Sequence, residues 1–108
     1  MIGGAHPRAL RWARRAEADL EAIHDYIADD DPVAAGRWLE KLLTRAAQIA
    51  PLPFTGRMVP EFGREELREV LLRTCRIVYR ITPGEVQVIT VFEGHRLFPA
   101  DVDTDPDP

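Results

Sequence analysis

The sequence predicts an α+β fold in which a helical hairpin packs on one face of a small, mainly antiparallel sheet. Two observations support this. Between residues 13 and 50, apolar side chains recur every three or four positions, which is the spacing of one helix face. After residue 66, apolar and polar side chains alternate as they do in strands. Because the helices come early and the strands late, the pattern favours α+β in the order strand, helix, helix and three strands.

The first elements are a short strand over residues 9–13 and a helix that begins near residue 13. Residues at helical spacing share one face of this helix: Ala13, Ala16, Leu20, Ile23 and Ile27. The helix is expected to end at the three consecutive aspartates 29–31.

A second helix is expected to begin at Asp31 and Pro32. Aspartate is a favourable N-cap, and proline suits the first helical position, where its missing N–H has no partner to lose. An apolar stripe continues to Ala50, and Pro51 ends it. The connection between the helices is short, so they should pack antiparallel.

Residues 51–63 contain three prolines and two glycines and are predicted to be a loop. Strands are expected over residues 67–72, 76–81 and 86–92. The turn between the last two is Pro83-Gly84, with positive φ predicted at Gly84.

The composition indicates one domain over residues 1–99 followed by an acidic tail over 100–108. The chain has 14 basic and 18 acidic residues, and four of the acids are tail aspartates, so the body is neutral. The tail is rich in Asp and Pro and is predicted to be disordered in the isolated protein. It serves either to solubilise the chain or to screen its arginines. A single cysteine and the lack of long apolar runs lead us to expect a cytoplasmic protein without membrane contact.

Several short motifs occur in an order that resembles the ParE/RelE toxin family. They cover most of residues 8–99 and read, in chain order, ADLEAIHDYI (18–27), GR (56–57), VPEF (59–62), LRE (67–69), RIVYR (76–80) and VFEGHR (91–96). The resemblance implies a toxin encoded beside an antitoxin that wraps and silences it. It also implies that DNA is contacted only through the antitoxin. The RelE-like branch cleaves mRNA on the ribosome, whereas characterised ParE-like members inhibit DNA gyrase.

The residues that distinguish the two branches favour ParE. In the RelE-like branch, sheet lysines and arginines share the cleavage chemistry with a late tyrosine. Arg76 and Arg96 match two of that branch's arginines, and Arg68 falls near one of its lysines. Val70 or Leu71 stands where a second lysine is expected, and no tyrosine follows Arg96. We therefore expect a gyrase inhibitor without catalysis, without cofactor and without metal.

Two alternatives stay open. An mRNA endoribonuclease would draw on the cations together with an acid and a base, so its candidate catalytic residues are Arg68, Arg76, Arg96, His95 and Glu61. Glu69 is a second candidate for the base, and a surface position without function is the other interpretation of His95. A chain that only binds its antitoxin and supports repression of the operon is the second alternative.

Binding of the antitoxin or the target is expected to involve arginines of the sheet and its loops: Arg57, Arg68, Arg76, Arg80 and Arg96. Arg76 and Arg80 flank Val78 on one face, where their stems would otherwise only cover apolar surface. If Arg76 acts directly, its replacement by alanine should change activity more than stability.

Overall fold

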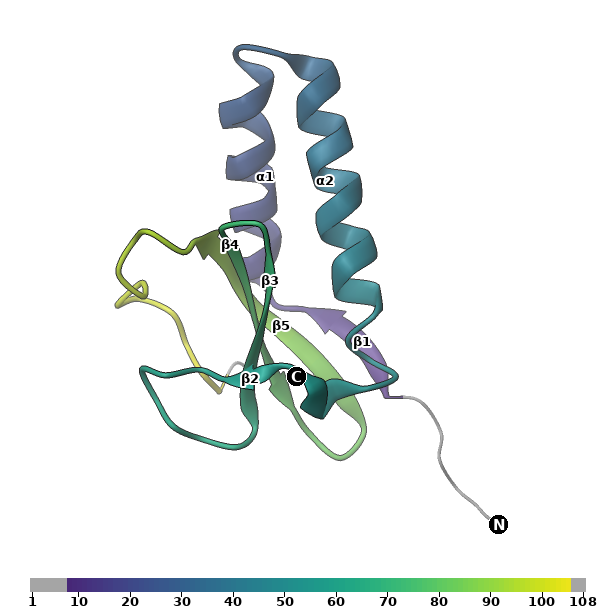
Figure 1. The fold of residues 1–108 in the computed structure, drawn as a ribbon, viewed down its shortest axis with the longest axis vertical. Coiled ribbons are helices and arrows are strands. Elements are labelled where there is room, and N and C mark those ends of the chain that lie inside the picture. Colours follow the sequence, from purple (N-terminus) through teal and green to yellow (C-terminus); the bar gives the residue numbers. More distant parts are fainter. Residues whose placement is uncertain (1–7, 106–108) are drawn as a thin grey trace.

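The computed structural model describes residues 8–105 and confirms the α+β architecture (Figure 1). Two helices project as an antiparallel pair beyond a five-stranded sheet (Figure 1). The elements are, in order, β1 (Ala9–Trp12), α1 (Arg14–Ala28), α2 (Pro32–Ala47), a 3-10 turn (Pro53–Thr55), β2 (Arg57–Met58), β3 (Leu67–Leu72), β4 (Cys75–Ile81) and β5 (Glu85–Glu93).

The strands are arranged in the order β1-β5-β4-β3-β2. β1 runs parallel to β5, and every other neighbouring pair is antiparallel. The short strand β2 lies in the segment predicted to be a loop, so that part of the prediction was wrong. Its two residues, Arg57 and Met58, pair with Glu69 and Arg68 of β3.

The predicted start of α2 is confirmed. The Asp31 side chain accepts hydrogen bonds from the backbone N–H groups of Val33 and Ala34, both at 3.1 Å, and Pro32 occupies the first turn. The helix ends at Ala47, three residues before the end of the apolar stripe. Ile49 is nevertheless buried, because a turn rather than a helix carries it into the core.

Replacing Asp31 with alanine is expected to lower the free energy of unfolding by about 1 kcal/mol, because two N–H groups at the helix start lose their acceptor. The measurement is urea unfolding followed by circular dichroism. The matched control is Asp30→Ala, which removes a neighbouring exposed carboxylate that does not cap α2. Equal losses in the two variants would show that charge, and not capping, is responsible.

The core has two parts, one on each face of the sheet. The larger cluster joins the helices to residues such as Leu42, Ile77 and Tyr79, and Trp38 packs partly buried against it. The smaller cluster lies on the other face, which we call the second face: Val59, Leu67, Val78, Ile89 and Phe92, with Phe98 and Val102 against them.

Backbone geometry at the turns differs from expectation. Gly84 does not have the predicted positive φ; within residues 8–105 that conformation occurs at Gly63 (φ 62°) and Arg73 (φ 54°). The β4–β5 turn is instead closed by Thr82, whose backbone N–H donates to the carbonyl of Glu85 at 2.9 Å. Its hydroxyl oxygen accepts from the Glu85 N–H at 3.2 Å. The hydrogen bonds between Thr82 and Glu85 therefore close this turn without a positive φ at Gly84.

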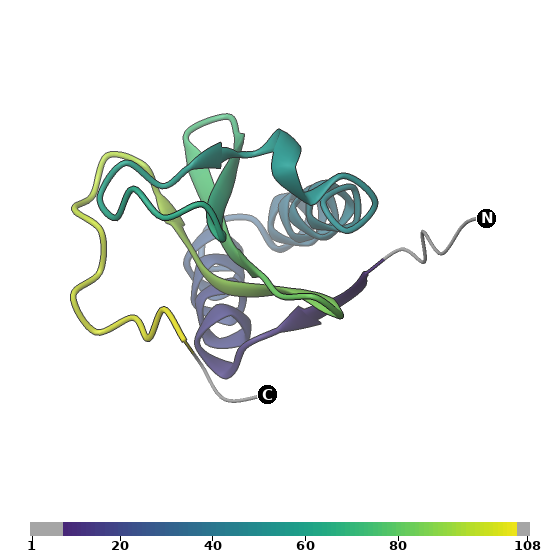
Figure 2. The same cartoon turned by 90° about the horizontal axis from the view of Figure 1, so that it is seen from below.

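The segment after β5 follows the side of the molecule opposite α2, next to the loop that joins β2 and β3 (Figures 1 and 2). Residues 100–105 lie against the body, where Asp101 and Asp105 contact arginines and Val102 packs against an apolar cluster. Residues 106–108 lie outside the described part. Among residues 8–105 no helix is long and apolar enough to cross a membrane.

Candidate functional site

Strand β4 presents its arginines to the second face of the sheet. Cys75, Ile77, Tyr79 and Ile81 point into the helix-covered core, while Val78 belongs to the second cluster. The alternation of a strand then places Arg76 and Arg80 beside Val78 on the second face. The predicted alternation along β4 is therefore confirmed.

Arg76 lies at the centre of a group that we call the arginine–glutamate cluster: Arg57, Glu61, Glu69 and Arg76. The two terminal nitrogens of Arg76 donate to the two carboxylate oxygens of Glu61 at 2.9 and 2.8 Å. Its Nε donates to Oε1 of Glu69 at 2.7 Å. Arg57 binds the other oxygen of Glu69, with Nε–Oε2 at 2.5 Å. The cluster therefore pairs two positive with two negative charges.

The Arg76–Glu69 pair at the centre of this cluster is buried. The side chain of Glu69 is 0% exposed and that of Arg76 is 8% exposed. The Arg76 guanidinium also lies over the rings of Phe92 and Phe98, at 5.0 and 5.8 Å from their centroids. Phe98 packs edge-on against both Phe62 and Phe92. Aromatic rings and carboxylates together surround the guanidinium.

The electrostatics favour the charged forms of Glu61 and Arg76. The hydrogen bonds from Arg76 lower the pKa of Glu61 below its ordinary value despite partial burial. Hydrogen bonds to Glu61 and Glu69 raise the pKa of Arg76 above its ordinary value. A carboxylate held ionised in this way is a weaker proton acceptor than a free one.

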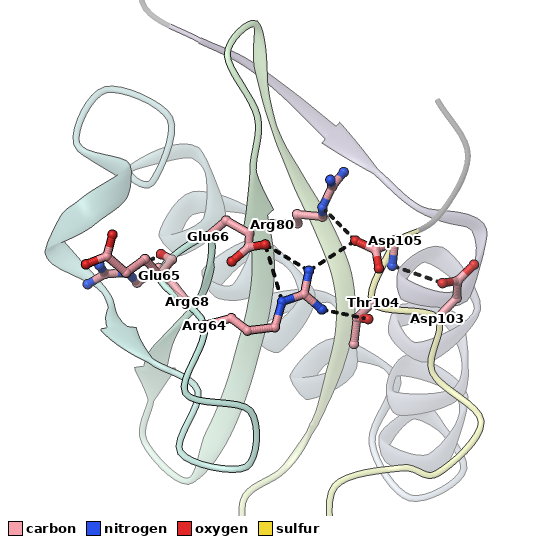
Figure 3. A network of polar contacts seen from close by, with 8 residues as sticks. All are labelled: Arg64, Glu65, Glu66, Arg68, Arg80, Asp103, Thr104 and Asp105. Carbon is pink, nitrogen blue, oxygen red and sulfur yellow. Dashed lines mark hydrogen bonds and ion pairs between the residues drawn. The ribbon is translucent and has the colours of Figure 1, made fainter.

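Arg80 meets the C-terminal segment at Asp105 (Figure 3). Its Nε lies 3.1 Å from Oδ1 of Asp105. The same oxygen of Asp105 accepts a hydrogen bond from Arg64 at 3.2 Å, and Arg64 also binds Glu66 and Thr104. The Arg80 Nε is buried, and its contact with Asp105 lacks the geometry of a hydrogen bond.

Arg68 lies on the opposite face from Arg76. It pairs in register with Tyr79, whose ring is in the helix-covered core. Its guanidinium donates to the backbone carbonyls of Glu65 at 2.8 Å and Gly56 at 3.1 Å. It also lies over the ring of Phe54. Arg68 therefore fastens the loop before β2.

His95 and Arg96 lie exposed in the turn that follows β5. The backbone N–H of Arg96 donates to the Glu93 carbonyl at 3.0 Å. Within the described range, neither side chain makes a hydrogen bond or an ion pair. Among the predicted site residues, Arg96 is therefore one whose guanidinium remains available to a partner.

The predicted site residues consequently do not converge on one exposed patch. Arg76 is buried with Glu61, Arg68 faces the other way, Arg80 contacts the tail, and Arg96 stands apart. Arg57 keeps an accessible side chain, 58% exposed, although it also binds Glu69.

Groups that could replace the missing late tyrosine are unsuitably placed. Tyr79 is buried, and its hydroxyl donates to the Pro53 carbonyl at 2.5 Å. Tyr26 is 85% exposed near the far end of α1.

Burial raises the pKa of Cys75 to about 12, with the charges of Glu93 and Asp19 adding to the effect. Proximity in sequence to Arg76 does not activate this thiol, because the two side chains lie on opposite faces.

Sequence reasoning missed three features of this region. Glu69 was considered only as a possible base, although its burial makes it the fixed partner of Arg57 and Arg76. Screening of the arginines by the acidic tail was one of two roles considered for the tail, but the specific pairing of Arg64 with Asp105 was missed. The role of Asp19 was missed as well: from α1, its carboxylate accepts hydrogen bonds from two residues of β5. A surplus of arginines on one face and of aspartates in the tail was the available signal for the second.

Comparison with known families matches residues 10–98 to the ParE toxin of type II toxin–antitoxin systems. Toxin RelE2 of Caulobacter vibrioides is 34% identical over 87 residues, covering 80% of this chain and 94% of that protein. Protein Y4kP of Sinorhizobium fredii, whose name also describes it as a toxin, is 34% identical over 95 residues, covering 85% of this chain and 94% of that protein.

Solved structures share the fold. The chromosomal ParDE system from P. aeruginosa contains a chain that superposes with a TM-score of 0.70 at 23% identity, covering 82% of this chain and 98% of that one. The RelBE2 toxin–antitoxin complex from Mycobacterium tuberculosis gives 0.61 at 21% identity, covering 83% and 94%. At these identities the similarity concerns the fold alone.

Proposed function

The chain belongs to the ParE toxin family and is the toxin of a type II toxin–antitoxin system, and from this premise we propose that it arrests growth by binding DNA gyrase. In this proposal the toxin is a protein–protein inhibitor without catalysis. A cognate antitoxin neutralises it, in keeping with the complexes named for the structural neighbours.

The observation that carries the proposal is the state of Arg76. A nuclease of the RelE-like branch would use this arginine to hold the phosphate as negative charge develops on the phosphate. Here Glu61 and Glu69 already occupy its guanidinium, and the side chain is 8% exposed. To receive a phosphate, Arg76 would have to leave two carboxylates, one of them fully buried, and that separation is costly.

The acid and base of a nuclease are also poorly supplied. Glu61 has both oxygens engaged by Arg76, which lowers its pKa and its strength as a base. His95 is exposed in a turn and is not held by another side chain of the described residues. Proton transfer needs groups positioned within hydrogen-bond reach of the reacting atoms. These features support a binding function over RNA cleavage.

Accessible arginines are the contacts that we propose for the gyrase or antitoxin interface. Arg96 is exposed and without a side-chain partner in the described range, and Arg57 keeps more than half of its side chain exposed. Arg68, which is half-buried and bonded to two backbone carbonyls, is the proposed contact on the opposite face. Arg76 supports this interface indirectly, by fixing the loop that carries Glu61.

The test is expression of the protein alone and together with its antitoxin, followed by two assays on purified toxin. We expect growth arrest that the antitoxin relieves, inhibition of gyrase supercoiling, and intact ribosome-bound mRNA. His95→Ala is the discriminating variant, because loss of this histidine should leave gyrase inhibition unchanged. Cleavage of mRNA that His95→Ala abolishes would replace this proposal with the endoribonuclease. Full viability on strong expression would leave only the antitoxin-binding role.

A further inference from the structure

The last described residues of the chain lie on the body in the manner of a bound peptide. We call residues 98–105 the C-terminal strap. Phe98 and Val102, four residues apart, pack against the apolar cluster of the second face. These are the two apolar anchors of the strap.

Two carboxylates of the strap, also four residues apart, contact arginines of the body. Asp101 lies 2.7 Å from a terminal nitrogen of Arg15, in the first turn of α1. Asp105 contacts both Arg64 of the loop before β3 and Arg80 of β4 (Figure 3). We call Arg15, Arg64 and Arg80 the arginine strip. Three separate elements thus supply cations to one short acidic segment.

The ion pairs of the strap are exposed. The side chains of Asp101 and Asp105 are 77% and 56% exposed, and ion pairs at such exposure contribute little to stability. Its backbone bond from Val102 N–H to the Pro99 carbonyl is internal to the strap. The buried Nε of Arg80 also lies against Asp105 without a proper hydrogen bond. A buried donor in this state would be better satisfied by a differently placed acceptor.

We propose that the arginine strip and the apolar cluster beside it form a docking surface for an acidic peptide segment of a partner protein, and that the strap is its internal competitor. The segment would carry two carboxylates four residues apart with an apolar residue between them, as the strap does. A peptide fits better than a nucleic acid because Phe98 and Val102, both partly buried, show that the surface packs apolar side chains beside its cations. If the partner is the antitoxin, the inference rests on the proposed function and adds a cost to antitoxin binding.

The test uses a labelled synthetic peptide with the sequence of residues 100–108. Its affinity for the full-length protein is measured by fluorescence anisotropy. In the wild-type protein the strap competes with the peptide. Asp105→Asn weakens the strap's contacts with two arginines, so the surface is open more often and the apparent affinity for the peptide rises. We expect an increase of about two- to fivefold at low salt, from the usual strength of exposed ion pairs. The increase should shrink as salt screens those pairs.

The matched control is Asp103→Asn, which removes one negative charge from the same strap. The Asp103 carboxylate accepts from the backbone N–H of Asp105 and, in the described residues, contacts no arginine. Its peptide affinity should equal that of the wild type. Equal affinities in the Asp105 and Asp103 variants would overturn the proposal, and so would absence of peptide binding to every variant up to millimolar concentration.

A single-stranded deca-thymidylate serves as the competing probe. Stronger displacement by this oligonucleotide than by unlabelled peptide would assign the surface to nucleic acid and overturn the peptide proposal. Gyrase inhibition is measured separately on the same preparations. Failure of the strap proposal therefore leaves the proposed function standing, and failure of gyrase inhibition leaves the peptide result readable.

Discussion

Replacing Arg76 with alanine is expected to lower the free energy of unfolding by about 3 kcal/mol, because one partner of a buried ion pair is removed. Glu69 is fully buried, and Arg76 is one of its two cations. Arg57 remains to compensate Glu69, which places the expected loss at the lower end of the roughly 3–5 kcal/mol seen for broken buried pairs. The measurement is urea unfolding, with the slope of the free energy against urea unchanged.

This result would reverse the expectation from sequence that Arg76→Ala changes activity more than stability. The double variant Glu69→Gln/Arg76→Met separates the two interpretations. Removing the buried charge together with its partner should recover much of the lost stability, since an uncompensated carboxylate no longer remains. Arg96→Ala is the control, with a change within about 0.5 kcal/mol for an exposed side chain. An Arg76→Ala protein of unchanged stability that no longer arrests growth would instead return Arg76 to a direct role.

Replacing Asp19 with alanine is expected to lower the free energy of unfolding by about 2–3 kcal/mol, because hydrogen bonds to a charged acceptor are lost inside the protein. Oδ2 of Asp19 accepts from the Thr90 hydroxyl at 2.6 Å and from the Val91 N–H at 3.0 Å. Both donors are buried on β5, next to the register shift opposite Val78 and Tyr79. Oδ1 accepts from Arg15 at 2.9 Å. One helix carboxylate therefore fastens α1 to an irregular part of the sheet.

The control for Asp19 is Asp25→Ala on the same helix. The Asp25 side chain is 71% exposed and contacts His24. Its replacement should change the melting temperature little. Asp19→Asn keeps an acceptor oxygen and should lose less than Asp19→Ala. Similar melting temperatures for the Asp19→Ala and Asp25→Ala proteins would contradict the anchoring role of Asp19.

Much of the fold could be predicted from local pattern. The strand over residues 67–72 and the start of α2 at Pro32 agree with the structure, and the later strands differ by one residue at each changed end. These features depend on side-chain alternation, on N-capping and on proline, which are properties of neighbouring residues. The strand β2, the register shift in β5 and the positive φ at Arg73 escaped prediction. The first two depend on a partner strand, and Arg73 lies in the two-residue turn between Leu72 and Cys75, where glycine rather than arginine is the usual residue at positive φ.

The sequence by itself determined the α+β toxin fold of this protein. It also showed which residues were available for function: several arginines, and no tyrosine after Arg96. It could not rank Arg76 against Arg96, because each matches an arginine of the RelE-like branch. Only the tertiary structure separated them. Folding brings Glu61 and Glu69, which lie fifteen and seven residues away in the chain, onto the guanidinium of Arg76, while Arg96 stays exposed in its turn. Charge pairing and burial depend on which segments meet in space, and local sequence does not specify those meetings.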